Sequence, residues 1–223
     1  MRILTWTVQG DCGEGVGDER LNELNKIIEY WDKQENYDPV TIICLQEVNG
    51  KEGALTKALL ANEWVCYSVH EQVNGGGRYS VIAVRPGYDI KADSNQGEII
   101  NLEDFRDPQG ITSRPVRNPI VLPIEVEGQT VYIITWHATL GSRQIEDFVG
   151  LSNWIDAEIS DEPVIIAADL NQTEDVLSGP YYNGFGGVSH HLDHILGRNI
   201  VVSNGEHSNY SSSDHLPISA HFA

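Results

Sequence analysis

The chain has 223 residues, which is enough for one large domain or two small ones with a core that needs no disulfide or metal to hold it. Its composition, 40% hydrophobic and 21% charged, is that of a globular protein and excludes disordered and fibrous classes. The formal net charge of −19 argues against a general electrostatic grip on a polyanion, so a phosphate-bearing partner would have to be met locally, by a few arginines and a bound cation.

In chain order, apolar patterning predicts strands at residues 3–8, 41–45, 64–69, 79–84, 120–126, 131–136, 164–168, 194–196, 200–202 and 216–220. Apolar residues at spacings of three and four predict helices at 19–31, 51–61 and 143–159. Residues 125–129 carry a hairpin signal. The polar stretch 86–118 has little periodicity and predicts a functional surface rather than a linker. Hairpins mixed with crossover helices favour a sandwich of sheets with outer helices.

The start of the chain has no basic segment followed by an apolar run, and no stretch is long and apolar enough to span a membrane. We therefore expect a cytoplasmic protein, or an exported one whose targeting segment is absent from this numbering. Cys12, Cys44 and Cys66 cannot make a disulfide framework and do not have metal-site spacing, which favours a reducing compartment.

Five predicted strands end, or begin, in polar residues of one chemical kind. These are Thr7 and Gln9 after the first strand, Glu47 after the second, His137, then Asp169 with Asn171, and finally Asp214 with His215 before the last strand. A single carboxylate after a strand usually caps a turn, but together these residues are the parts of a hard-cation site with a general acid and base beside it.

The chemistry of phosphate ester hydrolysis requires such parts. Glu47 and Asp214 suit Mg²⁺, which takes one or two carboxylates and leaves other positions to water and substrate phosphate. Histidine, with an unperturbed pKa of roughly 6.5, suits proton transfer and needs a carboxylate to set its tautomer. Asp193 is a candidate for that partner.

Six motifs in order resemble the endonuclease/exonuclease/phosphatase superfamily. They are Thr5-Trp6-Thr7-Val8-Gln9-Gly10, Leu45-Gln46-Glu47-Val48, Trp136-His137-Ala138, Ala168-Asp169-Leu170-Asn171, Leu192-Asp193-His194-Ile195-Leu196 and Ser213-Asp214-His215-Leu216-Pro217. The motif pattern is most similar to pancreatic-type deoxyribonucleases and cytolethal distending toxin nuclease subunits. The resemblance implies one domain over residues 1–223 with a four-layer α/β/β/α sandwich of two mixed sheets flanked by helices.

The resemblance also implies roles for individual residues. Glu47 would be the principal metal ligand, and Asp214 a second metal-side or water-orienting carboxylate. His215 would act on the attacking water, steered by Asp193, and His137 would bind or protonate the phosphoryl group. Asp169 and Asn171 would contact the metal, the water and the scissile phosphate. Arg114, and Arg78 before the strand at 79–84, would contact phosphate.

One position departs from the family pattern, because the first motif usually has asparagine where this chain has Thr7. A threonine hydroxyl is shorter and lacks the amide geometry. Three explanations stay open: a natural variant with weakened or shifted metal binding, a role for Gln9 in its place, or an engineered substitution.

Other clusters have simpler interpretations. His190, His191 and His194 lie near Asp193 but are expected to be loop or supporting residues rather than a transition-metal site, and the five tryptophans are expected in the core. The aromatic, glycine-rich segment 181–187 is either a substrate-contacting loop or an ordered turn.

Three functions follow. The first is a nuclease that uses Mg²⁺ (or Mn²⁺ or Ca²⁺), acts on DNA rather than RNA and works as a monomer. The second is a phosphatase or phosphodiesterase acting on lipid or inositol phosphates. The third is a family member that binds without cutting, which Thr7 leaves open.

Overall fold

The computed structural model of the chain describes residues 1–11, 15–33, 38–49, 53–70, 78–88, 90–92, 98–100, 117–138, 144–173, 184–208 and 211–223. Its elements, in order, are β1 (Arg2–Thr7), α1 (Val16–Asp32), β2 (Val40–Val48), α2 (Ala54–Ala61), β3 (Val65–His70), β4 (Tyr79–Val84), β5 (Ile90–Ala92), β6 (Glu98–Ile99), β7 (Ile120–Val126), β8 (Gln129–His137), α3 (Gln144–Glu158), β9 (Val164–Asp169), β10 (Gly186–His190), β11 (Asp193–Arg198), β12 (Val202–His207) and β13 (Ile218–Phe222).

The strands of these described ranges form two mixed sheets. The six-stranded sheet has the order β12-β13-β1-β2-β4-β3, and the seven-stranded sheet has the order β10-β11-β9-β8-β7-β5, with β6 also pairing with β7. Each sheet has one parallel pair, β1 with β2 and β8 with β9, and its other pairs are antiparallel. Parallel strands need a crossover connection, and α1 and α3 supply it.

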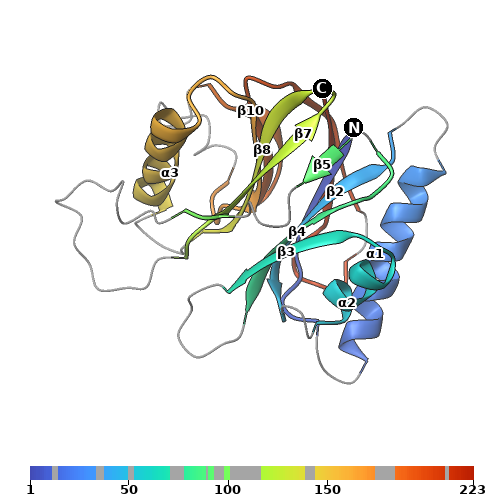
Figure 1. The fold of residues 1–223 in the computed structure, drawn as a ribbon. Helices are drawn as coiled ribbons and strands as arrows, with labels where there is room; N and C mark the ends of the chain where they lie inside the picture. The colour runs from blue at the N-terminus through green and yellow to red at the C-terminus, as the bar shows by residue number, and fades with distance from the viewer. Residues whose placement is uncertain are drawn as a thin grey trace.

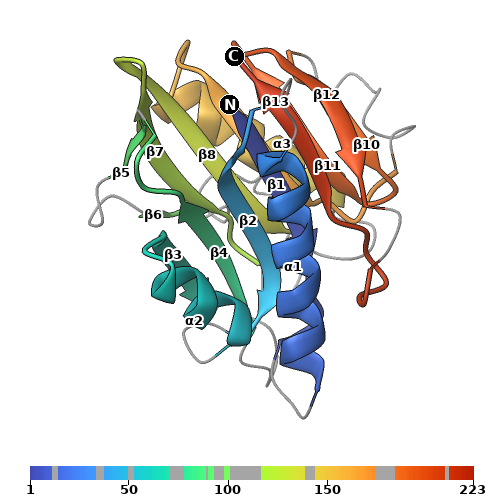
Figure 2. The ribbon, with the colours of Figure 1, turned by 90° about the vertical axis from the view of Figure 1, so that its right-hand side faces the viewer.

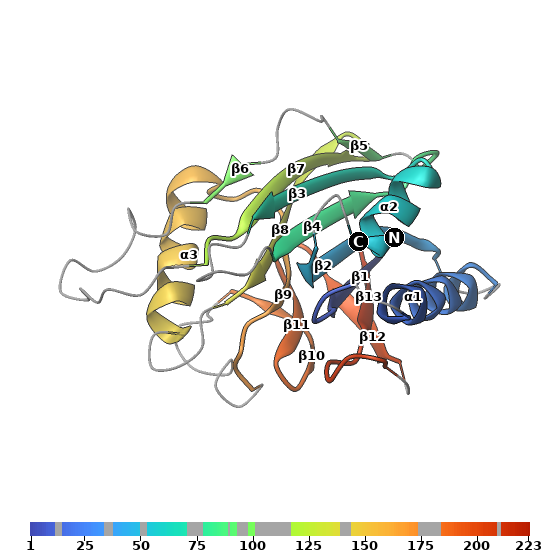
Figure 3. The ribbon, with the colours of Figure 1, turned by 90° about the horizontal axis from the view of Figure 1, so that it is seen from below.

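The two sheets pack face to face, with helices on both outer faces. Figure 3 shows the layers, with α3 outside the seven-stranded sheet and α1 and α2 outside the six-stranded one. One apolar cluster fills the space between the sheets and draws on both, including Ile42, Ile82, Ile133 and Ile165. Two further clusters lie under α3 and under α1 with α2. The predicted four-layer sandwich is confirmed.

The apolar patterns place the elements because each periodicity matches a buried face. Leu24 and Trp31 of α1 are buried, and β1 and β2 are buried along almost their whole length because both of their faces are covered. Figures 1 and 2 show α1 lying against the sheet that contains these strands. The predicted hairpin is also present, since β7 and β8 are joined by Glu127 and Gly128 with φ of 53° and 84°.

One strand was not predicted, and one strand prediction was wrong in its bounds. Strand β10, Gly-Gly-Val-Ser-His, was not predicted, because a half-exposed edge strand carries few apolar residues. The strand expected at 200–202 instead runs over Val202–His207, and its exposed polar half shows no apolar signal. Of the stretch 86–118, β5 and β6 are paired with β7, while most of it lies outside the described residues. No helix in the described ranges is long and apolar enough to cross a membrane.

Strand register brings the polar strand ends to one edge of the sandwich. Thr7 pairs with Gln46 across β1 and β2, and His137 pairs with Asp169 across β8 and β9. Asp169 in turn pairs with Asp193 at the start of β11. Because β13 runs antiparallel to β1, the loop before β13 reaches the same edge.

Candidate active site

A histidine and an aspartate from different sheets form a short polar contact at this edge. The Nδ1–H of His215, in the loop before β13, donates to Asp193 Oδ2 at 2.7 Å. This leaves His215 Nε2 facing Asp169 Oδ2 at 3.8 Å and Asp214 Oδ1 at 3.6 Å. Burial disfavours the charged ring, but Asp193, followed by Asp169 and Asp214, raises the pKa of His215 to about 9. The imidazole therefore carries both protons at neutral pH in the metal-free protein.

A second histidine lies between two carboxylates. His137 Nδ1 is 3.3 Å from Glu47 Oε1, and His137 Nε2 is 3.6 Å from Asp169 Oδ2. The Asp169 side chain is 1% exposed. Burial raises the pKa of Asp169 to about 6, with Asp193 adding to the shift and His137 opposing it. Two acids and two histidines thus share one poorly solvated space, where a proton is easily moved.

Thr7 lies inside this group and not beside it. Its hydroxyl is 3.1 Å from Asp193 Oδ1, 3.3 Å from Gln46 Oε1 and 3.5 Å from Asp169 Oδ2. The hydroxyl has a single proton to donate, and the Asp193 oxygen is its nearest acceptor. Thr7 therefore helps to hold the carboxylate that orients His215. Gln9 is exposed, with φ of 60°, and its proposed substitute role stays a prediction.

Glu47 reaches the site through an irregularity in β2. The pairing of β2 with β4 shifts register between Leu45 and Val48, and Glu47 has a left-handed φ of 57°. Bulges of this kind re-aim a side chain next to active sites. The Glu47 carbonyl accepts hydrogen bonds from the Gly10 N–H at 2.8 Å and from Arg78 Nη1 at 2.9 Å, and these two bonds hold the bulge. Arg78 thus contacts the backbone of Glu47 in this structure, and its predicted phosphate contact remains untested.

Gln46 ties the two sheets together beneath the site, and sequence reasoning missed it. Its amide Nε2 donates to Thr135 Oγ1 at 2.7 Å and to Thr5 Oγ1 at 3.0 Å, and the side chain is fully buried. A polar residue in an otherwise apolar, doubly buried strand was the available signal, since a buried amide is expected to be hydrogen-bonded.

The loop that carries Asp214 and His215 is held by residues to which the sequence assigned no role, Ser213 and Glu23. Ser213 Oγ donates to the Thr7 carbonyl at 2.8 Å and accepts the His215 N–H at 3.2 Å. Glu23 of α1 accepts both the N–H and the hydroxyl of Ser212, each at 2.7 Å, and is 4% exposed. Helix α1 therefore fixes the loop through a buried carboxylate. An acid at a buried position of a helical stripe was the only sequence signal.

The remaining predicted residues divide into those placed and those not described. Asn171, with φ of 53°, donates its N–H to Asp169 Oδ1 at 2.9 Å and its amide Nδ2 to the Ala138 carbonyl at 2.7 Å, so it adjoins the site. Asp214 also adjoins it, with a side chain 65% exposed. Arg114 and residues 181–183 lie outside the described residues.

His194 is not a ligand candidate. Its ring is buried between Ser189 and the Gln172 carbonyl, each 2.7 Å away, and burial lowers its pKa to about 4. The expectation that it supports the structure agrees with this position.

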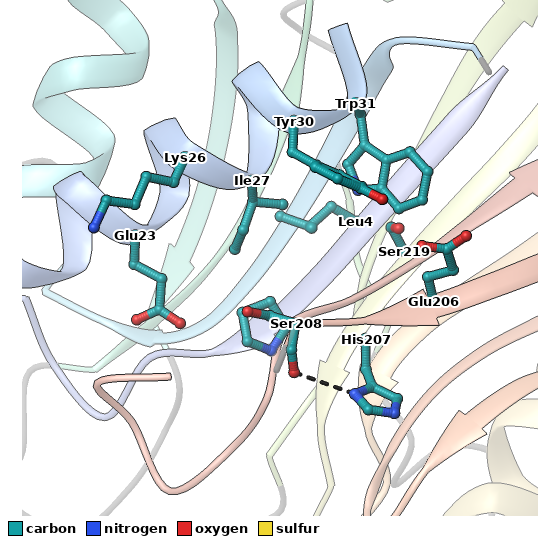
Figure 4. Close-up of a pocket in the computed structure, with 11 residues that line it drawn as sticks. Leu4, Glu23, Lys26, Ile27, Tyr30, Trp31, Glu206, His207, Ser208 and Ser219 are labelled. Carbon is teal, nitrogen blue, oxygen red and sulfur yellow. Dashed lines mark hydrogen bonds between the residues drawn. The ribbon is translucent and has the colours of Figure 1, made fainter. Parts of the chain in front are cut away.

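Two cavities differ in what they can do chemically. A pocket of about 470 Å³ is lined by Asp193, Asp214 and His215 and opens from the site. A groove of about 310 Å³ lies between α1 and the end of β12, with apolar walls that include Ile27 and Trp31 (Figure 4). It contains none of the paired acids and histidines, so the reaction centre belongs to the first pocket.

The donor set fits a hard divalent cation. Ligand atoms of Asp169, Asp193 and His215 lie within 4.8 Å of one another. Glu47 lies next to this group, because His137 is 3.3 Å from Glu47 and 3.6 Å from Asp169. Asp193 already accepts from His215 and Thr7, and His215 is a nitrogen donor that Mg²⁺ disfavours. Carboxylate oxygens of Glu47 and Asp169 are therefore the better candidates within this group. Two ionised acids in a buried space are destabilised unless a cation or proton joins them.

The chain matches the model of the Endonuclease/Exonuclease/phosphatase family over residues 12–215. No curated protein matches it by sequence. Solved structures with the same fold include the catalytic domain of human Nocturnin with bound sulfate, at TM-score 0.74 and 15% identity over 100% of this chain and 93% of that one.

Two other similar structures differ in what they bind or act on. One is TDP2 from D. rerio complexed with a single-strand DNA product, at TM-score 0.70 and 16% identity over 100% of this chain and 98% of that one. The other is a mannosyl-6-phosphatase from Bacteroides thetaiotaomicron, at TM-score 0.71 and 13% identity over 100% and 99%. Identities this low show a shared fold alone.

Proposed function

Because the chain belongs to the endonuclease/exonuclease/phosphatase family, whose members hydrolyse phosphate esters, we propose that it is a divalent-metal-dependent phosphodiesterase that cleaves DNA. The observation that carries the proposal is the Asp193–His215 pair at 2.7 Å, beside Asp169 and His137. This is the arrangement that water activation needs, a base oriented by a carboxylate next to a site that binds phosphate.

His215 is the proposed base. Asp193 holds the proton on Nδ1, so Nε2 is the atom that takes a proton from the attacking water. Only the fraction of His215 that has lost its Nε2 proton can do this, and a pKa of about 9 in the metal-free protein makes that fraction small at neutral pH. Turnover should therefore rise with pH through the neutral range.

His137 and Asp169 are proposed to handle the phosphoryl group. His137, between Glu47 and Asp169, presents an N–H donor to a phosphoryl oxygen. Asp169, with Asn171 held against it, orients the water. A divalent cation held by Glu47 and Asp169, with Asp214 on its water side, would neutralise charge on the phosphoryl oxygens.

A second candidate is a phosphatase acting on a small phosphate monoester, such as an inositol or lipid phosphate. The likeness to a mannosyl-6-phosphatase favours it, because the same fold there serves a sugar phosphate. The non-cutting alternative has less support, because Thr7 retains a hydrogen bond to Asp193 and leaves the acids and histidines in place.

The test is incubation with supercoiled plasmid in Mg²⁺, Mn²⁺, Ca²⁺ or EDTA, with a matched RNA in parallel. We expect cation-dependent nicking that is lost in His137→Ala and His215→Ala and kept in His221→Ala. The last is a matched control, since His221 pairs with Asp38 at the far end of β13.

Other outcomes would redirect the assignment. Intact plasmid together with phosphate release from an inositol or lipid phosphate would favour the second candidate. Absence of turnover on every substrate, with recovery in Thr7→Asn, would identify a weakened site.

A further inference from the structure

Three histidine rings gather where the edge strands of the two sheets meet. His190 ends β10, His191 follows it, and His207 ends β12. The rings of His190 and His207 stack with centroids 4.4 Å apart and 29° between their planes, and His191 meets His190 edge-on at 4.5 Å. Figure 2 shows strands β10 and β12 side by side. They approach so closely that a side chain at Gly205 would collide with Val188.

Two of these rings face the reaction centre. His190 and His191 line the pocket of about 470 Å³ that Asp193, Asp214 and His215 also line. A ligand pocket is typically about 300–1,000 Å³, so this space is large enough for more than a phosphate group. A phosphoryl group held by His137 and Asp169 would lie next to His215, so a group attached to it can reach the pocket that the two rings line.

We infer that His190 and His191 form a stacking platform for a nucleobase of the substrate, with His207 supporting His190 from behind. This inference rests on the proposed nuclease function and names what that function recognises. Imidazole rings serve as stacking partners for unpaired bases in single-stranded nucleic acids.

The charge of the protein favours such a platform for a nucleic acid substrate. With a net charge of −19, and Asp193 and Asp214 in the same pocket, phosphates beyond the one held at the reaction centre gain little attraction. Stacking on a ring is independent of that charge, since every base presents a π-face.

Two other uses of the cluster fit less well. Burial, followed by His207 and His191, lowers the pKa of His190, which disfavours the charged ring that an anion site would need. Among the described residues, the group whose donor atoms converge closely enough for one ion is Asp169, Asp193 and His215, not the three imidazoles.

The first test uses thymidine, which has a base but no phosphate and needs neither metal nor turnover. Binding is followed by NMR of the histidine ring signals, with 1-O-methyl-2-deoxyribose as the base-free probe. We expect saturable ring-current shifts at His190 and His191 with thymidine alone. Affinity should fall about fivefold or more in His190→Ala, recover in His190→Phe, and stay unchanged in His221→Ala, because stacking needs an aromatic face.

The second test compares hydrolysis of the p-nitrophenyl esters of thymidine 5′- and 3′-phosphate with methyl p-nitrophenyl phosphate, which has no base. The preference is the ratio of kcat/KM for the better thymidine ester to that for the methyl ester. We expect a preference of at least tenfold that His190→Ala removes and His190→Phe restores.

The outcomes separate this inference from the proposed function. Equal shifts from the base-free sugar, undiminished thymidine binding in His190→Ala, or failure of His190→Phe to restore it would overturn the stacking platform even if the esters are hydrolysed. No hydrolysis of any ester, with thymidine binding as expected, would contradict the phosphodiesterase and leave the base site supported.

Discussion

The two sheets share one local plan, a parallel pair flanked by antiparallel strands, but they deliver site residues in different ways. In the seven-stranded sheet, His137, Asp169 and Asp193 are neighbours across three consecutive strands, so pairing alone aligns them. In the six-stranded sheet, Glu47 comes from a bulge and His215 from a loop.

This difference shows how the position of each site residue is fixed. Strand register fixes the backbone of the first three residues, because moving one would break the ladder of hydrogen bonds between the strands. Bulge and loop residues need tethers, which here are Gly10 and Arg78 for Glu47 and Glu23 with Ser213 for the His215 loop. Substitutions in the six-stranded sheet should therefore be of two kinds. Some remove a reacting side chain, and others remove a hydrogen bond that holds the bulge or loop carrying it.

The largest effect is expected from removing the proposed base. His215→Ala should lower kcat by about 10²–10⁴-fold with little change in KM, since general base catalysis contributes about that much. Asp193→Asn should lower kcat by a factor in the same range, because an amide does not fix the imidazole tautomer. Steady-state kinetics on a p-nitrophenyl phosphodiester would measure both. A His215→Ala enzyme within threefold of the wild type would remove His215 from the chemistry.

The next effect is on stability and follows from the pKa of about 9 for His215, against roughly 6.5 in the unfolded chain. Because the folded-state pKa is the higher one, the stabilising contribution is fully present below about pH 6.5 and is lost as pH rises through about 9. The change is on the order of 3 kcal/mol, at about 1.4 kcal/mol per pKa unit.

Urea unfolding of the wild type and His215→Gln in EDTA, from pH 6 to 10, would measure this contribution. The difference in unfolding free energy between the two should shrink across that range. Parallel pH curves for the two proteins would show that Asp193 does not hold a charged imidazole.

A smaller effect is expected from the tether on α1. Glu23→Ala leaves the N–H and hydroxyl of Ser212 without their buried acceptor, which costs about 1–3 kcal/mol and loosens the His215 loop. We expect kcat to fall about tenfold, with partial recovery in Glu23→Gln. Glu29→Ala is the matched control, since this exposed acid of the same helix pairs only with Lys33 among the described residues. Equal kcat in Glu23→Ala and Glu29→Ala would contradict the tether.

The smallest effect is expected at Gly10. Its φ of 92° is unfavourable for any other residue, and a Cβ there would meet the Arg78 guanidinium. Gly10→Ala should displace Arg78 from the Glu47 carbonyl and weaken cation binding several-fold, measured by calorimetry. An unchanged cation affinity would show that the bulge at Glu47 stands without Arg78.

Sequence alone predicted the sandwich and most of its strands, because the buried face of a helix or strand carries apolar residues at regular spacing. It also singled out the strand-end acids and histidines, which the structure brings to one edge. It could not find Gln46 or Glu23, because their roles depend on contacts 89 and 189 residues away along the chain. Edge strand β10 was not predicted, because its half-exposed residues have no regular apolar pattern.

The function of Arg78 shows a further limit. The family resemblance implies a phosphate contact for Arg78, which stays a prediction, and the structure shows Arg78 Nη1 donating to the Glu47 carbonyl. A guanidinium has five donors, and no sequence pattern says which acceptor each one meets.

We propose that acids and histidines from both sheets act together as one cation-dependent site for hydrolysing phosphate esters. Hydrolysis of bis(p-nitrophenyl) phosphate in Mg²⁺ or Mn²⁺, measured in the wild type and in Glu47→Gln and His137→Ala, tests it most directly. We expect EDTA to abolish turnover. Either substitution should reduce turnover at least a hundredfold, because Glu47 and His137 come from different sheets and both are needed. Turnover that persists in EDTA, or that survives both substitutions, would contradict it.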